Sequence, residues 1–555
     1  MDWKQNKNKK WIAILFFILL LALGTRFFAD YGISWDEPTE RRSGIYSFCI
    51  IYKFFTGDTL GVDLTKWSDR YYGVGLQHIL LLADYLAGFF NVHPYGNLPS
   101  WLLRHFLTCI FMICGLFFLY RTAFMLWKDH LKALLPVVLF LFIPRFVAES
   151  FYNIKDMGLL AAVMIGGYFM VRYAFRTTWQ NALYLGIVTA FVCSVRLSGL
   201  QFLLAGVGTA LFMDMICKGR FCYKKILLHL LCLFTGFAVC IFLFYPAGWE
   251  KGFYDFFREA IAYMAHHPWQ NTIRFCGKDW HAGSQPWYYL IVWIGVTTPL
   301  PVLFLLFTGS VCVLKKYFAS PLKNLQKRTM LVLLMFFLMF WGELLLLPFI
   351  VKSIYNGWRQ FYFLGFPMLI LACCGLISLW NIAVKNRFSR MAFIAAAAVI
   401  TCFHVTWMIT QHPHQYLYFN ILSSDPQNDF ELDYWHVSQT EALRKILTRH
   451  AHEPEPKTIA YNYTLSTAMA MLGDEEQQQF REVSRYGYYD YIIILNDNGC
   501  RNPGSNDRYP LKKPRKIISD EIRWIKNSLW TKEIMAYRIV GFEKTPGSEI
   551  KMVEY

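Results

Sequence analysis

The sequence predicts a polytopic α-helical membrane protein with a small α/β domain at its C-terminal end. Of the 555 residues, 55% are hydrophobic and only 17% are charged, a balance typical of a chain with several membrane spans. Long apolar runs recur up to residue 410, and charged residues become frequent from about Gln411. We therefore predict two domains, a membrane domain over residues 1–411 and an extracytoplasmic domain over residues 412–555.

A helix needs roughly 20 apolar residues to cross a bilayer, and about eleven segments come close to that length. The first run is not a cleavable signal peptide, because no small-residue cleavage site follows it and further spans come after it. The fifth segment is short. The predicted spans are residues 11–29, 100–120, 131–147, 157–175, 180–195, 198–217, 226–245, 288–314, 329–350, 361–381 and 391–410.

Basic residues set the predicted orientation. Lys9 and Lys10 stand directly before the first span, so the positive-inside rule places the N-terminus in the cytoplasm, and an odd number of spans places the C-terminus outside. The remaining basic clusters then fall in cytoplasmic loops, where they can also contact anionic membrane lipids. The net charge of +17 is thus explained without nucleic acid, since no soluble segment shows a basic face with interleaved aromatic residues.

Two outer segments are long, residues 30–99 and residues 246–287. They contain stretches that are apolar but interrupted by polar residues, which is typical of helices lying on the membrane surface. These predicted interfacial helices are Ser43–Phe55, Gly73–Phe90 and a helix near Gly252–Ala265.

The C-terminal segment has the pattern of a small α/β module. Lys457–Leu465 and Tyr488–Leu495 have the apolar runs of buried strands, and Thr440–His450 has the pattern of a helix.

The motif Gly32–Pro38 (GISWDEP) places two adjacent carboxylates, Asp36 and Glu37, just beyond the first span. Side by side, they are too close to act as general acid and general base on opposite faces of one bond. One carboxylate acting as the base, with the other positioning a group or binding a metal, is the better interpretation. A solvated acidic turn is the structural alternative.

A second outer loop, Pro144–Asp156 (PRFVAESFYNIKD), carries cations and anions between two spans. Arg145 or Lys155 could hold a phosphate group. Asp156 could pair with Lys155, shape the site or bind a metal.

Further cations stand at the outer ends of later spans. Arg196 lies in SVRLSG, and Lys352 and Arg359 flank the aromatic residues Tyr355 and Trp358. Snorkelling to the interface is the structural alternative for Arg196. The positive-inside rule disfavours Lys and Arg on this face, so a bound anion would explain their presence.

The second long outer segment adds candidates for contacts with a sugar substrate. Trp269 and Lys278 lie in it, and its aromatic residues could stack on a sugar ring or form an interfacial belt. His266, His267 and His281 lie in the same segment, but their spacing fits no metal motif.

The order of these motifs resembles the GT-C glycosyltransferases, and most of all the bacterial relatives of protein O-mannosyltransferases and of the lipid A aminoarabinose transferase. The resemblance covers most of residues 30–435. The segments that carry it are GISWDEP (32–38), PRFVAESFYNIKD (144–156), SVRLSGL (194–200), PWYY (286–289), YNGWRQFYF (355–363), HPHQYLYFN (412–420) and ELDYW (431–435).

The resemblance implies an inverting transfer of one sugar from a polyprenyl-phosphate donor to a hydroxyl of a lipid, glycan or protein acceptor on the outer face. Asp36 matches the acid that acts as base, Glu37 matches its neighbour, and Asp156 matches the acid that supports the site or a metal. Because Asp36 and Glu37 are adjacent, the choice between them stays open. A divalent metal is a possible cofactor, since only some relatives use one. The cations expected to hold the donor phosphate are Arg145, Lys155, Arg196, Lys352 and Arg359.

The main alternative is a membrane transporter or flippase of lipid-linked sugars. Such proteins place paired charges or broken helices near the middle of the bilayer. In this sequence the charged candidates stand at the outer ends of the spans, which favours an enzyme acting at the interface.

Overall fold

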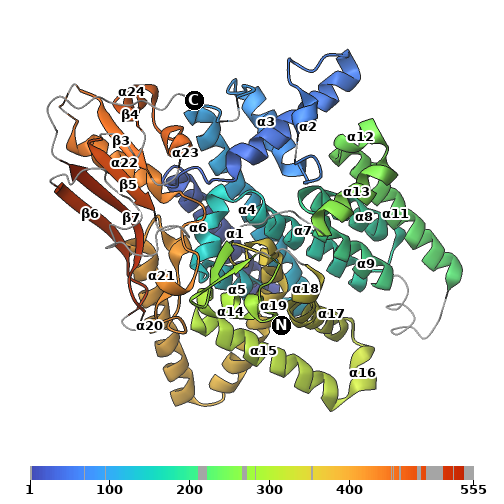
Figure 1. The fold of residues 1–555 in the computed structure, drawn as a ribbon. Coiled ribbons are helices and arrows are strands. Elements are labelled where there is room, and N and C mark those ends of the chain that lie inside the picture. The colour runs from blue at the N-terminus through green and yellow to red at the C-terminus, as the bar shows by residue number, and fades with distance from the viewer. Residues whose placement is uncertain are drawn as a thin grey trace.

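The computed structural model shows a bundle of helices beside a small mixed sheet (Figure 1). The bundle holds the N-terminal three quarters of the chain, and the sheet holds most of the rest. The structure describes residues 3–67, 69–93, 95–209, 222–265, 272–281, 283–351, 354–451, 453, 455–461, 464–483, 489–495, 517–528 and 531–542.

Among the described residues, eight helical segments are long and apolar enough to cross a membrane, or nine if one bent pair counts as a span. The predicted class of polytopic helical membrane protein is confirmed. The eight are Lys9–Phe27 in α1 (Trp3–Phe27), α4 (Leu98–Trp127), α7 (Asp156–Phe175), α11 (Tyr223–Phe244), α15 (Leu300–Ala319), Arg328–Ile350 (α17, Arg328–Phe337; η4, Leu338–Gly342; α18, Glu343–Ile350), Arg359–Ala383 (η5, Arg359–Leu364; α19, Gly365–Ala383) and α20 (Arg387–Thr410).

Four of the eleven predicted spans differ from a single long helix, and one of the four is the bent pair. The predicted span 180–195 is the apolar helix α8 (Trp179–Val195), which has only 17 residues. The predicted span 288–314 is divided at Pro299 into α14 (Tyr289–Thr297) and α15. The predicted span 198–217 begins as η2 (Leu197–Gly199) and α9 (Leu200–Gly208), and its remainder from residue 210 lies outside the described residues.

The predicted span 131–147 is the bent pair. It consists of α5 (His130–Leu141) and α6 (Pro144–Tyr152), which meet at an angle of 80°. Pro144 causes the break, because proline disfavours the helical conformation of the residue before it, and Ile143 is extended. The predicted loop 144–156 is therefore wrong over most of its length, since α6 occupies it and only a short turn remains before α7.

The helices predicted in the two long outer segments are confirmed as helices, and their place at the membrane surface stays a prediction. The first segment contains α2 (Glu37–Thr56), η1 (Leu64–Lys66) and α3 (Gly75–Leu86). The second contains α12 (Ala247–Lys251), α13 (Phe253–Ala265) and the hairpin of β1 (Thr272–Phe275) and β2 (Lys278–His281). The short helix α16 (Pro321–Leu325) joins α15 to α17.

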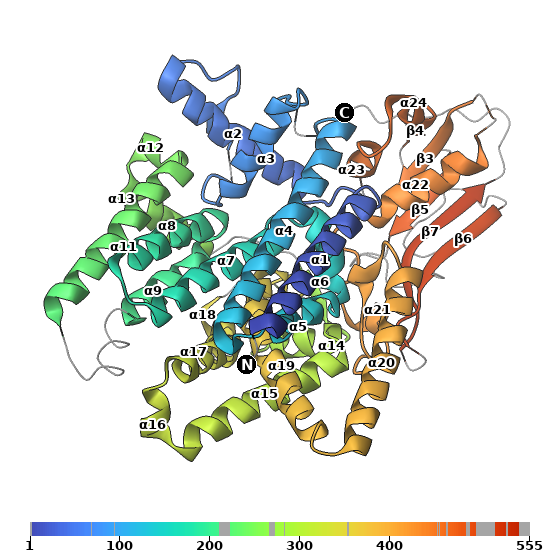
Figure 2. The same cartoon turned by 180° about the vertical axis from the view of Figure 1, so that it is seen from behind.

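The C-terminal module is a five-stranded sheet in the order β4-β3-β5-β7-β6, drawn in orange and red in Figures 1 and 2. The predicted strands are confirmed as β3 (Lys457–Tyr461) and β5 (Tyr491–Leu495), which pair in parallel. The predicted helix is confirmed as α22 (Ser438–Arg449), which packs on the sheet through Leu443 and Ile446. The other elements are α23 (Ser466–Met469), α24 (Asp474–Gln477), β4 (Phe480–Glu482), β6 (Ile517–Ile525) and β7 (Ile534–Phe542).

Residues 411–437 connect this module to the bundle through η6 (Gln415–Leu417) and α21 (Pro426–Asp429). Asn420 donates its side-chain amide to the carbonyl oxygens of Gly295 (2.6 Å) and Thr298 (2.7 Å). The backbone N–H of Trp35 donates to the carbonyl of Trp435 over 3.0 Å. The connecting segment is thus packed against both α14 and the loop between α1 and α2, and the predicted domain boundary at residue 411 stays a prediction.

Candidate active site

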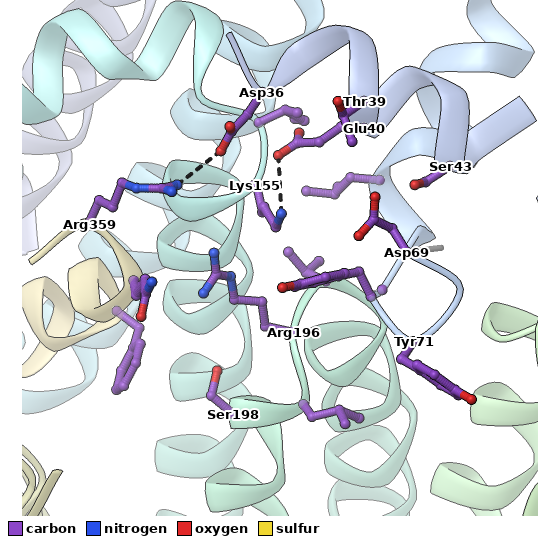
Figure 3. Close-up of a pocket in the computed structure, with 18 of the residues that line it drawn as sticks. Asp36, Thr39, Glu40, Ser43, Asp69, Tyr71, Lys155, Arg196, Ser198 and Arg359 are labelled. Atoms are coloured by element: carbon purple, nitrogen blue, oxygen red, sulfur yellow. Dashed lines mark hydrogen bonds and ion pairs between the residues drawn. The ribbon is translucent and has the colours of Figure 1, made fainter. Parts of the chain in front are cut away.

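A cavity of about 470 Å³ opens where several segments distant in sequence meet. Its walls come from the start of α2, the connection between α2 and α3, the turn before α7, η2 and η5 (Figure 3). The polar and charged side chains that line it are Asp36, Thr39, Glu40, Ser43, Asp69, Tyr71, Tyr72, Gln77, Lys155, Arg196, Ser198, Tyr355, Arg359, Gln360 and Tyr434.

Asp36 is the residue directly before α2. Pro38 and the acidic side chains of the first turn favour a helix start at this point. The carboxylate of Asp36 makes no capping bond to its own helix. It accepts hydrogen bonds from the hydroxyl of Tyr434 (2.7 Å) and from the guanidinium of Arg359 (3.1 Å) instead.

Arg359 links the first acid to the second. The same nitrogen of Arg359 that reaches Asp36 donates to Asp156 over 3.0 Å, and the other terminal nitrogen donates to Tyr434 over 3.0 Å. Asp156 is the first residue of α7, is fully buried, and also accepts from Arg196 over 2.5 Å. The result is a continuous row of alternating charges: Asp36, Arg359, Asp156 and Arg196.

The surroundings of Asp36 keep it ionised. Burial by itself raises the pKa of a carboxyl group, but the positive charges of Arg359 and Lys155 and the hydrogen bond from Tyr434 outweigh that effect. The pKa of Asp36 is therefore lowered below its usual value.

Glu40 and Lys155 form a second, looser contact in the same cavity, 3.7 Å apart (Figure 3). The ammonium group of Lys155 also lies 4.3 Å from the centre of the Tyr72 ring. Burial raises the pKa of Glu40 to about 8, against the lowering effect of Lys155 and together with the nearby carboxylates of Asp36 and Asp156. Glu40 thus differs from Asp36, because it binds a proton near neutral pH.

Glu37 points away from this cavity although it follows Asp36 directly. Its carboxylate accepts from the backbone N–H of Ser34 (2.6 Å) and lies 3.1 Å from the ring of His105. Successive helical residues point about 100° apart, which is why α2 separates the two acids. The predicted acid pair is therefore divided between two environments.

Three more of the predicted site residues lie away from the cavity. Arg145 is buried on α6 over the rings of Trp293 (5.7 Å) and Phe419 (5.0 Å). Trp358 is buried and donates its indole N–H to the hydroxyl of Thr297 over 3.0 Å. Lys278 is exposed on β2.

The rest of the predicted set is divided between the cavity and the part of the chain outside the described residues. Tyr355 lines the cavity with Lys155, Arg196 and Arg359. The candidates that lie outside the described residues are Trp269 and Lys352, together with His266 and His267.

Two residues that sequence reasoning missed are prominent in the cavity. Glu40 stands four residues after Asp36, a spacing that places both on one face of a helix, but the helix was predicted to begin only at Ser43. Tyr434 belongs to the ELDYW motif, to which no role was given. Only the fold brings it to Asp36, 398 positions away in the chain.

The described residues do not form a ready metal site. Among them, no group of three or more His, Cys, Asp and Glu side chains is placed to hold a metal ion. The carboxylates of Asp36 and Asp156 are instead engaged by Arg359 and Arg196. A divalent metal stays a prediction from the resemblance.

Comparison with known proteins identifies similarity over part of the chain. Residues 85–250 match the family of dolichyl-phosphate-mannose-protein mannosyltransferases. No curated protein matches the sequence. The segment 85–250 contains Lys155, Asp156 and Arg196 but not Asp36, Glu40 or Arg359.

Two solved structures of ArnT from Cupriavidus metallidurans are similar at low identity. The complex with undecaprenyl phosphate is 12% identical with a TM-score of 0.47, and the match covers 95% of this chain and 97% of that one. The apo form is 11% identical with a TM-score of 0.46, covering 95% and 98%. The family match confirms the resemblance to GT-C glycosyltransferases of the protein O-mannosyltransferase type and supports a multi-pass membrane glycosyltransferase.

Proposed function

We propose that this protein transfers a sugar from a polyprenyl-phosphate donor to an acceptor hydroxyl, with inversion, on the outer face of the membrane. The observation that carries this proposal is the cavity, where the ionised carboxylate of Asp36 lies beside the cations Lys155, Arg196 and Arg359. The matched family is described by a dolichyl-phosphate-mannose donor, which agrees with a lipid-linked sugar phosphate as the substrate.

The cations are suited to hold the donor phosphate. Arg359 is fixed between two carboxylates and Tyr434, so its guanidinium is ordered before a substrate arrives. Charge-assisted hydrogen bonds from Arg and Lys to phosphate oxygens are among the stronger polar contacts in proteins. Negative charge that accumulates on the departing phosphate would be stabilised by groups already in place.

In the transfer step, Asp36 acts as general base. It takes the proton of the acceptor hydroxyl as that oxygen forms a bond to the anomeric carbon. The bond from that carbon to the phosphate oxygen breaks on the opposite face, and its electron pair leaves with polyprenyl phosphate. A phosphate is a good leaving group, so the step needs no strong general acid.

Asp36 is a better candidate than Glu37 for the base. Asp36 faces the cavity, whereas Glu37 is held by Ser34 and His105 on the other side of the helix start. Donor binding would draw the ammonium group of Lys155, which helps to lower the pKa of Asp36, towards the phosphate and away from Asp36. The loss of that positive charge raises the pKa of Asp36 and makes it a stronger base when the substrates are present.

The outer-face location rests on the sequence. The basic residues before Trp11 favour a cytoplasmic N-terminus, and Asp36 follows the other end of α1. The flippase alternative has weaker support, because Asp36, Asp156 and Arg359 each lie at the start of a helix rather than at its middle.

The test is release of free polyprenyl phosphate from a panel of labelled polyprenyl-phosphate sugars by purified protein in lipid nanodiscs. We expect the wild-type protein to release the carrier from one donor, and Asp36→Asn to release little from any. The Glu37→Gln variant is the matched comparison for the neighbouring acid. Carrier release by folded Asp36→Asn at the wild-type rate would contradict the assignment of the base, and release by neither protein would contradict the transferase function.

A further inference from the structure

Among the ion pairs that the structure describes in the cavity, the contact between Glu40 and Lys155 is the longest. Its 3.7 Å compares with 3.1 Å for Asp36–Arg359, 3.0 Å for Asp156–Arg359 and 2.5 Å for Asp156–Arg196. The side chain of Lys155 is also the most exposed of the three cations, at 22% against 19% for Arg196 and 6% for Arg359. Lys155 is thus the cation that changes partner most easily.

When Glu40 is ionised, the ion pairs that the structure describes in the cavity are balanced before any ligand binds. Three carboxylates, Asp36, Glu40 and Asp156, face three cations, Lys155, Arg196 and Arg359. A sugar phosphodiester adds one further negative charge. Burying an unbalanced charge is costly, so the phosphodiester is expected to bind best when one of these carboxylates is protonated and neutral.

Glu40 is the carboxylate most readily neutralised. Asp36 and Asp156 share Arg359, and Asp156 also retains Arg196. If Lys155 moves to the phosphate, the nearest remaining hydrogen-bond partner of Glu40 is the side-chain amide of Gln77, which donates to it over 3.4 Å. An acceptor oxygen of a protonated carboxyl group can keep that bond.

We propose that the donor phosphodiester binds with Glu40 in its protonated form, which frees Lys155 for the phosphate and makes donor affinity depend on pH. Glu40 is then a positioning residue, which acts on the substrate through Lys155. This inference rests on the proposed function, since it requires a lipid-linked sugar phosphate in the cavity.

The groups around Glu40 support proton uptake. Burial is the main cause that raises its pKa to about 8, and the negative charges of Asp36, Asp156 and Glu37 act in the same direction, against Lys155. The titratable and charged groups on the surrounding elements are Asp36 and Glu37 on α2, Asp69 and Tyr72 before α3, Arg104 on α4, Lys155 and Asp156 at the start of α7, and Arg196 before η2.

The sign of the pH dependence follows from the loss of Lys155 as a partner. The pKa of Glu40 is higher in the complex than in the free protein, where it is about 8. Donor affinity is therefore constant at pH values below about 8 and falls above that value, by up to about tenfold for each pH unit.

The experiment measures the Kd of polyprenyl-phosphate mannose for the protein in nanodiscs between about pH 6.5 and pH 9.5. This probe is a phosphodiester with a single ionisation, so its own charge does not change over the range. We expect wild-type affinity to fall above about pH 8, and Glu40→Gln to bind at all pH values with an affinity close to that of the wild-type protein at low pH. The matched control is Asp69→Asn, which removes another cavity carboxylate and should retain the pH dependence.

The outcomes separate this inference from the function on which it rests. Binding by the wild-type protein with a flat pH profile, or a full pH dependence in folded Glu40→Gln, would overturn the role of Glu40 and leave the transferase function standing. Absence of binding at every pH would overturn both. If Glu40→Gln does not fold, Glu40→Asp retains a titratable group, and a flat profile in that variant would also overturn the inference.

Discussion

Two ionic clusters lie on either side of Gln77, and they use the same residue types in different ways. The cavity cluster consists of Asp36, Glu40, Lys155, Asp156, Arg196 and Arg359, and all of these except the buried Asp156 line the open cavity. The closed cluster consists of Arg41, Asp84 and Arg104, where Asp84 lies 4.0 Å from Arg41 and 3.6 Å from Arg104. Gln77 accepts from Arg104 with one side-chain atom and donates to Glu40 with the other.

The two clusters differ in how far solvent or a ligand can reach their side chains. The side chains of Arg41 and Asp84 are fully buried, and Arg104 is 2% exposed. Arg41 also donates to the backbone carbonyls of Asn91 and His93, and Asp84 accepts from Ser100 over 2.9 Å. Ions sealed in this way hold helices in place, whereas ions with similar partners beside a cavity can exchange them for a ligand. Access, rather than charge alone, identifies the candidate site.

Removing the base should have the largest effect. Asp36→Asn keeps the shape of the side chain but cannot accept a proton, and general base catalysis contributes about 10²–10⁴-fold to a rate. We expect carrier release to fall by that factor while the melting temperature stays within a few degrees of the wild-type value. A large loss of thermal stability in Asp36→Asn would show that the cavity cluster is structural like the closed one.

The closed cluster should show the opposite pattern. Asp84→Ala leaves Arg41 and Arg104 buried without their carboxylate, a change that costs about 3–5 kcal/mol of stability in comparable buried pairs. We expect a strongly lowered melting temperature and poor recovery of folded protein. Near-normal stability together with lost carrier release would place Asp84 functionally with the cavity cluster.

Tyr434→Phe should have an intermediate effect. It removes the hydroxyl that donates to Asp36 and accepts from Arg359, and a hydrogen bond to a charged group is worth about 1.5–3 kcal/mol. We expect a roughly tenfold lower rate with normal folding, since a change of about 1.4 kcal/mol is a factor of ten. A rate equal to that of the wild-type protein would exclude Tyr434 from positioning Asp36 and Arg359.

The smallest effect concerns the pH at which the Asp36 carboxylate becomes protonated in the protein without donor. Because the pKa of Asp36 is lowered, its carboxylate stays ionised down to pH values below the usual range of Asp and is protonated only under more acidic conditions. In Tyr434→Phe a lowering contribution is lost, so that protonation should occur at a higher pH. NMR or infrared titration of the Asp36 carboxyl group would detect the shift, and an unchanged titration in Tyr434→Phe would contradict it.

The sequence predicted the helices and much of the cavity because both depend on position along apolar runs. Lys155, Asp156, Arg196 and Arg359 stand at the ends of helices, and ends on the same side of a bundle meet. Position at a helix end does not distinguish Arg145 from the residues that reach the cavity. It also lies near a helix end, but Trp293 and Phe419, far away in the chain, supply the rings that enclose it.

Two features of the site depend on information that apolar periodicity lacks. The role of Glu40 requires the start of α2 to be known to within one turn, and the apolar pattern marks only the later part of that helix. Tyr434 reaches the cavity because residues 411–437 return to α14 and to the loop between α1 and α2. Long-range packing of this kind leaves no local pattern in the sequence.

The returning segment also restricts how the chain can be divided. A protein ending at residue 411 would retain the predicted membrane domain but lose Tyr434, and with it one wall of the cavity. Likewise, replacing the C-terminal part with that of a relative would replace Tyr434, which lies beside Asp36, together with the sheet. The two halves are therefore expected to change together in evolution, and chimaeras joined after residue 437 should preserve activity better than chimaeras joined at residue 411.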